Sequence, residues 1–309
     1  GSHMRLVTRA FELLLAASCA LAFVAPVIAQ TPLTTPDAKA PESRDARVAV
    51  KDAGALGGDV EMAVKVYVPD RAGPFPVVLY SHGRAADDVD RRKLSQPVPL
   101  GHVTYWQRKG FAVVAPIRPG YGETGGADRE QSGSSFDNFG NCRSKPDFEG
   151  SAKNATAATL SALEWIRQQP WANKERILLV GTSMGGFTTV STAATNPPGV
   201  VGYVNIAGGS GGNPQRAPAR SCGVAEMEKV MAGFGRTTTV PNLWLYAEND
   251  QYWGAEAPKV WYTAFAAGGS PSKFVQTGPV PGYDGHQLML RGGRLWSVHV
   301  DAFVQALGL

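Results

Sequence analysis

The sequence has few of the residues and patterns on which several common functions depend. It holds only 3 cysteines and 5 histidines, and it contains no H-E-x-x-H, no C-x-x-C and no P-loop lysine. Neither a metal ion nor a nucleotide cofactor is therefore expected. Basic residues are not in clear excess, because 30 Lys and Arg face 26 Asp and Glu. The only dense basic run, Arg91–Lys93, lies beside three aspartates, so no nucleic-acid partner is expected.

The composition that remains is that of an ordinary globular protein, with 43% hydrophobic and 9% aromatic residues among 309. A disordered chain would combine lower hydrophobicity with a larger net charge. The 36 glycines and 22 prolines are numerous. They favour a fold with many tight turns between strands and helices rather than a helical bundle.

The first residues resemble a targeting segment rather than part of the fold. Gly1–His3 resemble the remnant of an expression tag. Residues 4–29 combine early arginines, a short apolar run and small residues before a cleavage site after Ala29, as secretory signal peptides do. A membrane anchor needs about 20 apolar residues, more than this run has, and a lipid on Cys19 is a second alternative. We expect a periplasmic or secreted protein with no stable membrane insertion after signal cleavage.

Removal of the signal would leave two cysteines, Cys142 and Cys222, both in loops rich in Gly, Ser, Pro and Arg. An exported chain meets an oxidising compartment, so these two are predicted to form a disulfide, with two free thiols as the alternative. Residues 30–47 are rich in Thr, Pro and Ala and have little to bury. They are expected to form a flexible N-terminal segment.

From about Val48 onward, short β-rich runs alternate with helical stretches. Runs such as Val77–Tyr80 and Ile177–Val180 are continuously apolar, as strands covered by helices on both faces must be. The predicted strands are 61–68, 77–81, 111–116, 177–181, 201–206, 242–247 and 273–276, and the predicted helices are 151–168, 184–195, 225–234, 257–267 and 295–307. The alternation predicts a single α/β domain with a mostly parallel, doubly wound sheet and helices on both faces.

The strongest chemical signal is the run Gly181–Gly186, which directly follows one predicted strand and directly precedes a helix. It contains the pattern G-x-S-x-G with Ser183 at its centre, in the strand–turn–helix context that gives this pattern meaning. A sharp turn leaves no room for side chains beside the serine, and the N-terminus of the following helix favours negative charge. Ser183 is predicted to be a nucleophile, with a structural glycine-rich turn as the alternative.

A nucleophilic serine needs a base and an orienting carboxylate, which follow it in the order acid, then histidine, when the serine lies on such a turn. Asp250 lies in the loop after the strand 242–247 and is the predicted acid, with Glu248 as the rival. His286 lies on a glycine-flanked loop near the C-terminus and is the predicted base. Asp284 is interpreted as a turn former.

An oxyanion hole needs two backbone N–H groups that converge on the substrate carbonyl. Met184, next to the nucleophile, is expected to supply one of them. Arg84, in the loop after the strand 77–81, is expected to supply the other, with Gly83 as the alternative. His82 is expected to stabilise this loop rather than act as a base.

Gly120–Gly125 formally matches the dinucleotide-binding pattern G-x-G-x-x-G, but a polar loop rather than a helix follows it. This segment is instead expected to lie over the active site, with Tyr121 as a candidate substrate-binding residue. Tyr252 and Trp253 are the other two candidates. The segments 124–150 and 210–239 are expected to form the rim of the pocket.

With these motifs, the sequence from about Val60 to Leu307 resembles the dienelactone-hydrolase-like serine hydrolases of the α/β-hydrolase superfamily. The residues that carry the resemblance are the His-Gly pair at 82–83, Arg118–Gly122, Gly181–Gly186, Tyr246–Asp250 and Asp284–His286. The resemblance implies an α/β-hydrolase catalytic domain over 48–309 that hydrolyses small carboxylic esters through a covalent acyl-enzyme. Dienelactone hydrolases proper carry a cysteine nucleophile where this chain has Ser183.

Three other functions share these residues. A peptidase related to the catalytic domain of prolyl oligopeptidase would direct the serine at an amide bond. An acyltransferase would pass the acyl group to an alcohol, and a binding protein would use the scaffold without catalysis. A complete set of Ser, Asp and His in the expected order favours an enzyme. The residues indicate no particular oligomeric state.

Overall fold

The computed structural model describes residues 39–309, so the expected tag, the expected signal peptide and Cys19 lie outside the described residues. Its centre is an eight-stranded sheet in the order β1-β2-β4-β3-β5-β6-β7-β8. The pairs β1–β2 and β2–β4 are antiparallel, and the pairs from β4 to β8 are parallel. The predicted single α/β domain with a mostly parallel sheet is confirmed.

The elements alternate along the chain as the sequence pattern predicts. The strands are β1 Arg44–Val50, β2 Val60–Tyr67, β3 Phe75–Ser81, β4 Ala112–Pro116, β5 Ala172–Thr182, β6 Val200–Ile206, β7 Asn242–Ala247 and β8 Ser272–Thr277. The helices are α1 Asp88–Arg92, α2 Leu100–Arg108, α3 Phe148–Arg167, α4 Met184–Ala193, α5 Val224–Thr237, α6 Ala257–Ala266, α7 Leu288–Arg291 and α8 Gly293–Ala306. Of these, β1, α1, α2 and α7 were not predicted.

Strand β1 corrects the expected extent of the flexible segment 30–47. Its residues Arg44–Val50 pair with Val60–Val66 of β2, so the last part of that segment belongs to the sheet. Only Val48 and Val50 of this strand are buried. A polar edge strand with so few apolar positions has no clear hydrophobic pattern, which is why the sequence did not indicate it.

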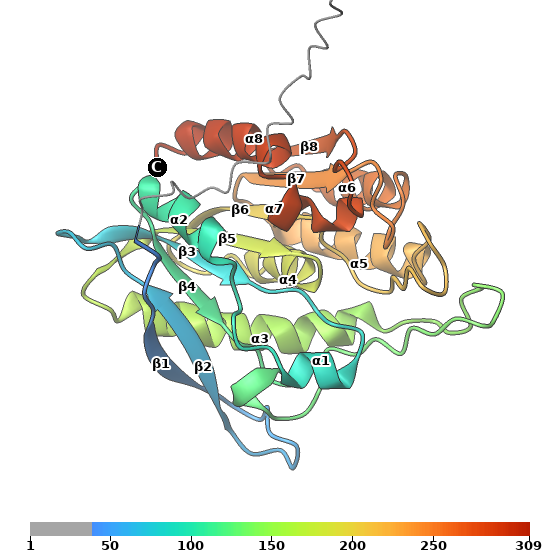
Figure 1. Ribbon diagram of the computed structural model, residues 1–309, viewed down its shortest axis with the longest axis horizontal. Coiled ribbons are helices and arrows are strands. Elements are labelled where there is room, and N and C mark those ends of the chain that lie inside the picture. Colours follow the sequence, from blue (N-terminus) through green and yellow to red (C-terminus); the bar gives the residue numbers. More distant parts are fainter. Residues whose placement is uncertain (1–38) are drawn as a thin grey trace, which may run out of the picture.

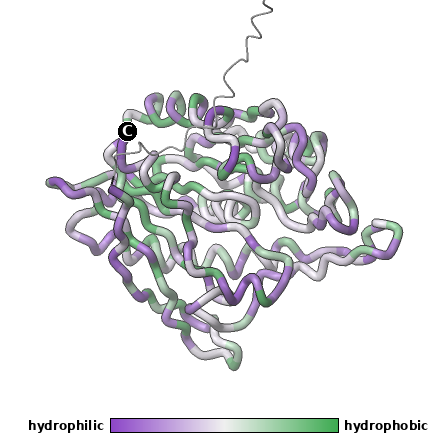
Figure 2. Tube along the Cα trace, viewed as in Figure 1, coloured by the Kyte–Doolittle hydropathy of each residue, from purple (hydrophilic) through white to green (hydrophobic). Residues whose placement is uncertain are grey.

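Helices cover both faces of the sheet (Figure 1). Helices α3, α4, α5 and α6 contribute to one large apolar core, and α2, α7 and α8 contribute to the other. Apolar residues are concentrated in the central strands and polar residues in the outer loops (Figure 2). Strand β5 is apolar over Ile177–Val180 because both of its faces are covered. None of the helices that the structure describes is long and apolar enough to cross a membrane.

The parallel strands bring distant loops to one edge of the sheet. In a sheet of this kind, the loops after the carboxyl ends of neighbouring strands lie side by side. Arg84 follows β3, and Ser183 and Met184 follow β5. Asp250 and His286 follow β7 and β8. The topology therefore collects the predicted site residues at this edge.

Candidate active site

Ser183 lies at the tight turn between β5 and α4. Its φ of 56° and ψ of −125° are values that residues other than glycine rarely adopt, so the turn holds the serine in a strained conformation. A Cβ atom on Gly181 would collide with the backbone of Gly185, and one on Gly185 would collide with the carbonyl group of Ser81. The pattern G-x-S-x-G thus follows from the space available at the turn.

Hydrogen bonds join Ser183, His286 and Asp250 in a row. His286 Nε2 lies 2.8 Å from Ser183 Oγ, and His286 Nδ1 lies 3.1 Å from Asp250 Oδ2. Asp250 is fully buried, and its Oδ1 accepts the backbone N–H groups of Tyr252 and Trp253. These bonds hold the carboxylate behind the imidazole. The arrangement can make Nδ1 the donor to Asp250 and leave Nε2 to accept the serine proton.

The neighbouring carboxylates are placed differently. Glu248, the rival acid, is exposed to solvent, whereas Asp250 is buried against His286. Asp284 Oδ1 accepts the backbone N–H of His286 and that of Gln251, each at 2.8 Å. Asp284 therefore ties the loop that carries His286 to the loop that carries Asp250.

Two aromatic side chains enclose the His286 ring. Tyr252 stacks on it with ring centroids 3.8 Å apart and planes at 24°, and Trp253 meets it edge-on at 5.2 Å. Trp253 Nε1 also donates to the carbonyl oxygen of Ala207 at 2.9 Å. Both candidate substrate-binding aromatics line the cavity at Ser183, so they can position the imidazole and contact a substrate at once.

The two expected oxyanion donors flank Ser183. Met184 opens α4, and the first N–H groups of a helix have no acceptor within it. On the other side, a Cβ atom on Gly83 would lie 3.3 Å from Ser183 Cβ, so this loop passes close to the serine. The Gly83 carbonyl oxygen lies 2.7 Å from His82 Nδ1. Because C=O and N–H point in opposite directions in a trans peptide, the Arg84 N–H is directed away from His82.

His82 has the loop-stabilising contacts that the sequence analysis expected. The backbone N–H of Arg118 donates to His82 Nε2 at 3.1 Å, and Arg118 Nη1 donates to the His82 carbonyl oxygen at 2.7 Å. Since Nε2 accepts, Nδ1 carries the proton that is donated to Gly83. Burial and the charge of Arg118 lower the pKa of His82 well below its ordinary value, so the ring is neutral.

Tyr121 does not line the cavity, which corrects the expectation for this residue. Its ring is buried against His82, with ring centroids 4.5 Å apart. Its hydroxyl donates to Glu130 Oε1 at 2.7 Å, and Glu130 is paired with Arg118 at 2.7 Å. A buried ion pair needs further hydrogen bonds to be stable, and the Tyr121 hydroxyl supplies one. The tyrosine therefore supports the loop that holds His82.

A cavity of about 400 Å³ opens at Ser183. The segments 124–150 and 210–239 are predicted from the sequence to form its rim, but no single rim residue is predicted. The lining from these segments includes Asp128, Gln131–Phe136, Ser210–Asn213 and Arg216. The clustering of Ser and Gly in these stretches was the available signal. Within residues 39–309 no three His, Cys, Asp or Glu side chains form a group that could hold a metal ion.

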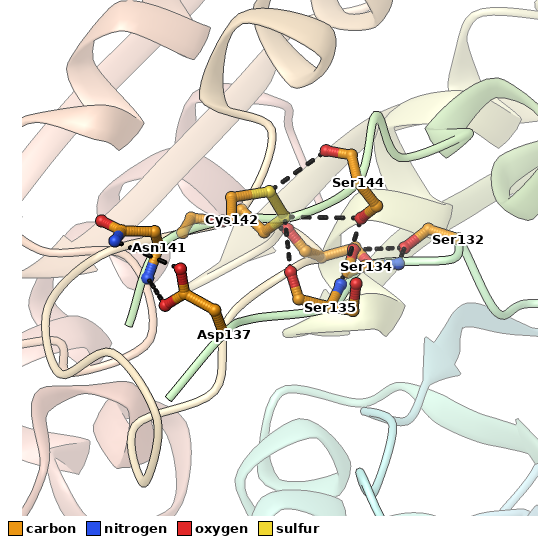
Figure 3. Close-up of a disulfide and its surroundings, with 10 residues drawn as sticks. Ser132, Ser134, Ser135, Asp137, Asn141, Cys142 and Ser144 are labelled. Atoms are coloured by element: carbon orange, nitrogen blue, oxygen red, sulfur yellow. Dashed lines mark hydrogen bonds between the residues drawn. A yellow bond between two sulfur atoms is a disulfide. The ribbon is translucent and has the colours of Figure 1, made fainter. Parts of the chain in front are cut away.

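A disulfide joins Cys142 to Cys222, as predicted from the cysteine count. It links the two rim segments to each other (Figure 3). Two nearby serines contact it in the same view: Ser144 Oγ lies 3.8 Å and the Ser135 carbonyl oxygen 3.7 Å from Cys222 Sγ. The hydroxyls of Ser132 and Ser134 lie 2.6 Å apart. The bond thus fixes two walls of the cavity relative to each other.

Solved structures share this fold. An esterase of Pyrococcus furiosus has a TM-score of 0.58 at 13% identity, with 86% of this chain and 91% of that chain covered. A dienelactone-hydrolase-like promiscuous phosphotriesterase from metagenomic libraries has a TM-score of 0.54 at 14% identity, with 86% and 99% covered. An acylaminoacyl peptidase of Pyrococcus horikoshii has a TM-score of 0.55 at 15% identity, with 88% and 42% covered. This chain therefore spans about two fifths of the length of that peptidase.

Similarity in sequence defines the family. A 2-hydroxy-6-oxononadienedioate/2-hydroxy-6-oxononatrienedioate hydrolase of Paraburkholderia xenovorans is 38% identical over 69 residues, which is 22% of this chain and 22% of that protein. The X-Pro dipeptidyl-peptidase (S15) family matches residues 57–233, more than half of the chain and including Ser183. The chain therefore belongs to the X-Pro dipeptidyl-peptidase (S15) family, within the α/β-hydrolase superfamily.

Proposed function

We propose that the protein is a serine hydrolase that cleaves small carboxylic esters. The observation that carries this proposal is the hydrogen-bonded row of Ser183, His286 and Asp250, with distances of 2.8 Å and 3.1 Å. A serine hydroxyl is a weak nucleophile unless a neighbouring base takes its proton and a third group orients that base. The row supplies both, and Ser183 faces a cavity of a size suited to a small molecule.

In the proposed reaction, His286 takes the proton of Ser183 Oγ as that oxygen attacks the ester carbonyl. The carbonyl oxygen becomes an oxyanion, which the N–H groups of Met184 and Arg84 stabilise. His286 then gives its proton to the departing alcohol, and an acyl group remains on Ser183. Water, deprotonated by His286, attacks this acyl-enzyme, and the carboxylic acid leaves as Ser183 regains its proton.

The charges around the cavity favour an ester over a peptide N-terminus. A dipeptidyl-peptidase must hold the cationic amino terminus of its substrate, for which a carboxylate is the natural partner. Among the described residues that line the cavity, Asp128 is the only acidic one. Its two oxygens already accept hydrogen bonds from Arg84 at 2.6 Å and 2.7 Å. No lining carboxylate is left to bind an ammonium group.

We further propose that the protein acts in the periplasm or outside the cell. The signal-like residues 4–29 suggest export. The disulfide between Cys142 and Cys222 is the kind of bond that persists in an oxidising compartment.

The proposal is tested by hydrolysis of 4-nitrophenyl esters of increasing acyl length, with Ser183→Ala as the comparison. The native chain is expected to hydrolyse short esters, and the variant to lose about 10³-fold or more in kcat. Equal melting temperatures of the two proteins would show that the variant is folded. Alanyl-proline 4-nitroanilide, assayed in parallel, tests the peptidase alternative. A variant as active as the native chain, or a higher kcat/KM on the anilide, would overturn the ester assignment.

A further inference from the structure

The cavity at Ser183 carries more positive than negative charge. Arg84, Arg91 and Arg216 reach it from three different segments, and Asp128 is the single acidic residue among the described lining residues. Arg84 binds Asp128 through two hydrogen bonds, and Arg91 Nη2 lies 3.6 Å from the same carboxylate. The described lining therefore holds three guanidinium groups and one carboxylate.

Arg84 and Arg91 are held in place by contacts within the protein. Besides its approach to Asp128, Arg91 donates to the carbonyl oxygens of Ala85 and Ala86 at 2.9 Å and 3.0 Å. It also lies 3.8 Å from Asp88. These two arginines contribute positive potential to the cavity, and both already have a carboxylate partner in Asp128.

Arg216 differs from the other two. Within residues 39–309 its guanidinium forms no salt bridge and no hydrogen bond, and the side chain is exposed at the cavity. The segment around it, 208–223, contains two arginines and no acidic residue. A guanidinium presents donors that match a carboxylate in two parallel hydrogen bonds. The guanidinium of Arg216 can therefore donate all of its hydrogen bonds to a ligand.

Hydroxyl groups line the cavity together with this arginine. Ser132, Ser134 and Ser135 come from the opposite rim segment, and the disulfide between Cys142 and Cys222 holds the two segments together. Serine hydroxyls donate readily to a carboxylate oxygen. The cross-linked rim thus combines a cation and neutral donors in one place.

We propose that this cavity selects esters that carry a carboxylate, which Arg216 binds while the ester carbonyl lies at Ser183. This rests on the proposed function for the chemical step. A half-ester of a short dicarboxylic acid has the required chemistry, because one end can be attacked and the other end is anionic at neutral pH. The excess positive charge of the cavity also attracts such a substrate over distance.

The test compares two 4-nitrophenyl esters that differ in one group: the hemiglutarate, which is anionic, and the 4-carbamoylbutanoate, its neutral isostere. Spontaneous hydrolysis is subtracted with Ser183→Ala. We expect kcat/KM to be about tenfold higher for the hemiglutarate, because a charge-assisted hydrogen bond stabilises the bound ester by about that factor. This preference should shrink in 0.5 M NaCl, because salt screens the charges. A second pair, 4-acetoxybenzoate and 4-acetoxybenzamide, places the charge on the alcohol side.

Arg216→Gln should remove the preference, mainly by raising KM for the anionic ester. Arg220→Gln is the matched control, because Arg220 lies on the same exposed segment but does not line the cavity. This variant should keep the preference. Equal kcat/KM for the charged and neutral members of both pairs, or the same loss in both arginine variants, would overturn the proposal.

A binding measurement separates this inference from the proposed function. Calorimetric titration should show glutarate binding to the native chain about tenfold more tightly than glutaramide, and Arg216→Gln should abolish that difference. If neutral esters are hydrolysed but glutarate shows no advantage, the charge selection is wrong while the esterase proposal stands. If no ester is hydrolysed but glutarate binds through Arg216, the esterase proposal fails and the anion site stands.

Discussion

Two carboxylates follow β7 only two residues apart, and their surroundings give them different chemistry. Asp250 is fully buried, accepts two backbone N–H groups and contacts His286 Nδ1. Glu248 is exposed to solvent. A carboxylate held behind the imidazole can keep the proton on Nδ1 and leave Nε2 to serve as a base, whereas an exposed one cannot. Position relative to His286 thus distinguishes two residues that are alike in the sequence.

Asp250→Asn is therefore expected to lower kcat for a short 4-nitrophenyl ester by about 10³-fold to 10⁴-fold, because the amide favours the wrong tautomer of His286. Glu248→Gln, the matched control, should change kcat less than about twofold. Steady-state kinetics and the melting temperature of each variant check both statements. A similar loss in the two variants would mean that Asp250 does not orient the base.

At the scale of elements, the cavity depends on segments that contain little regular structure. Between β4 and α3 the chain forms a long loop, and a second loop runs from β6 to α5. Each is braced by an isolated bridge, Phe136 with Cys142 in the first and Gly212 with Ser221 in the second. The disulfide then joins one loop to the other. Because long loops are otherwise mobile, such cross-links help them to keep a defined shape.

Replacement of Cys142 and Cys222 by serine is expected to reduce the free energy of unfolding by about 4 kcal/mol, because the disulfide spans 80 residues of chain. KM should rise as the rim loosens, and kcat should change less, because Ser183 and His286 lie outside both rim segments. Urea denaturation and ester kinetics measure these changes. Dithiothreitol should reproduce them in the native chain and have no effect on the double variant. Unchanged stability after either treatment would contradict the prediction.

At the scale of the whole molecule, two buried neutral histidines link stability to pH. Burial lowers the pKa of His102 to about 3, and Trp106 Nε1 donates to its Nε2 at 2.9 Å. Burial and the charge of Arg118 lower the pKa of His82 well below the ordinary 6.5. In the unfolded chain both rings take up a proton near pH 6.5, while in the folded chain they do not. Acid therefore favours the unfolded state.

The free energy of unfolding should accordingly fall between pH 7 and pH 5 by about 2 kcal/mol for each of these histidines. Stability falls in acid because the pKa of each ring is lower in the folded state than in the unfolded state. The stabilisation is present above pH 6.5 and is lost as the pH falls. Urea denaturation at pH 7, 6 and 5 measures the change. His102→Gln should reduce this pH dependence by about half, whatever its effect at pH 7. A pH-independent stability in this range would show that the two rings titrate in the folded chain.

The pattern of apolar residues predicts most of the architecture. Strands β2 to β8 are all predicted, and several of the central ones carry continuous apolar runs such as Ile177–Val180, because a strand covered on both faces must be apolar. Strand β1 and helix α2 are not predicted. The first is a polar edge strand, and the second has no side-chain cap and begins after a proline, Pro99. Elements with weak local signals form here because neighbouring elements pack against them.

The sequence by itself determined the class of fold, and it predicts Ser183, Asp250 and His286, in that order, as the catalytic residues, because periodicity and turn chemistry act over only a few residues. The tertiary structure alone decided that Tyr121 supports a buried ion pair and that Arg216 faces the cavity. The direction of a side chain on a long loop depends on contacts with segments far away in the chain. No local pattern records those contacts.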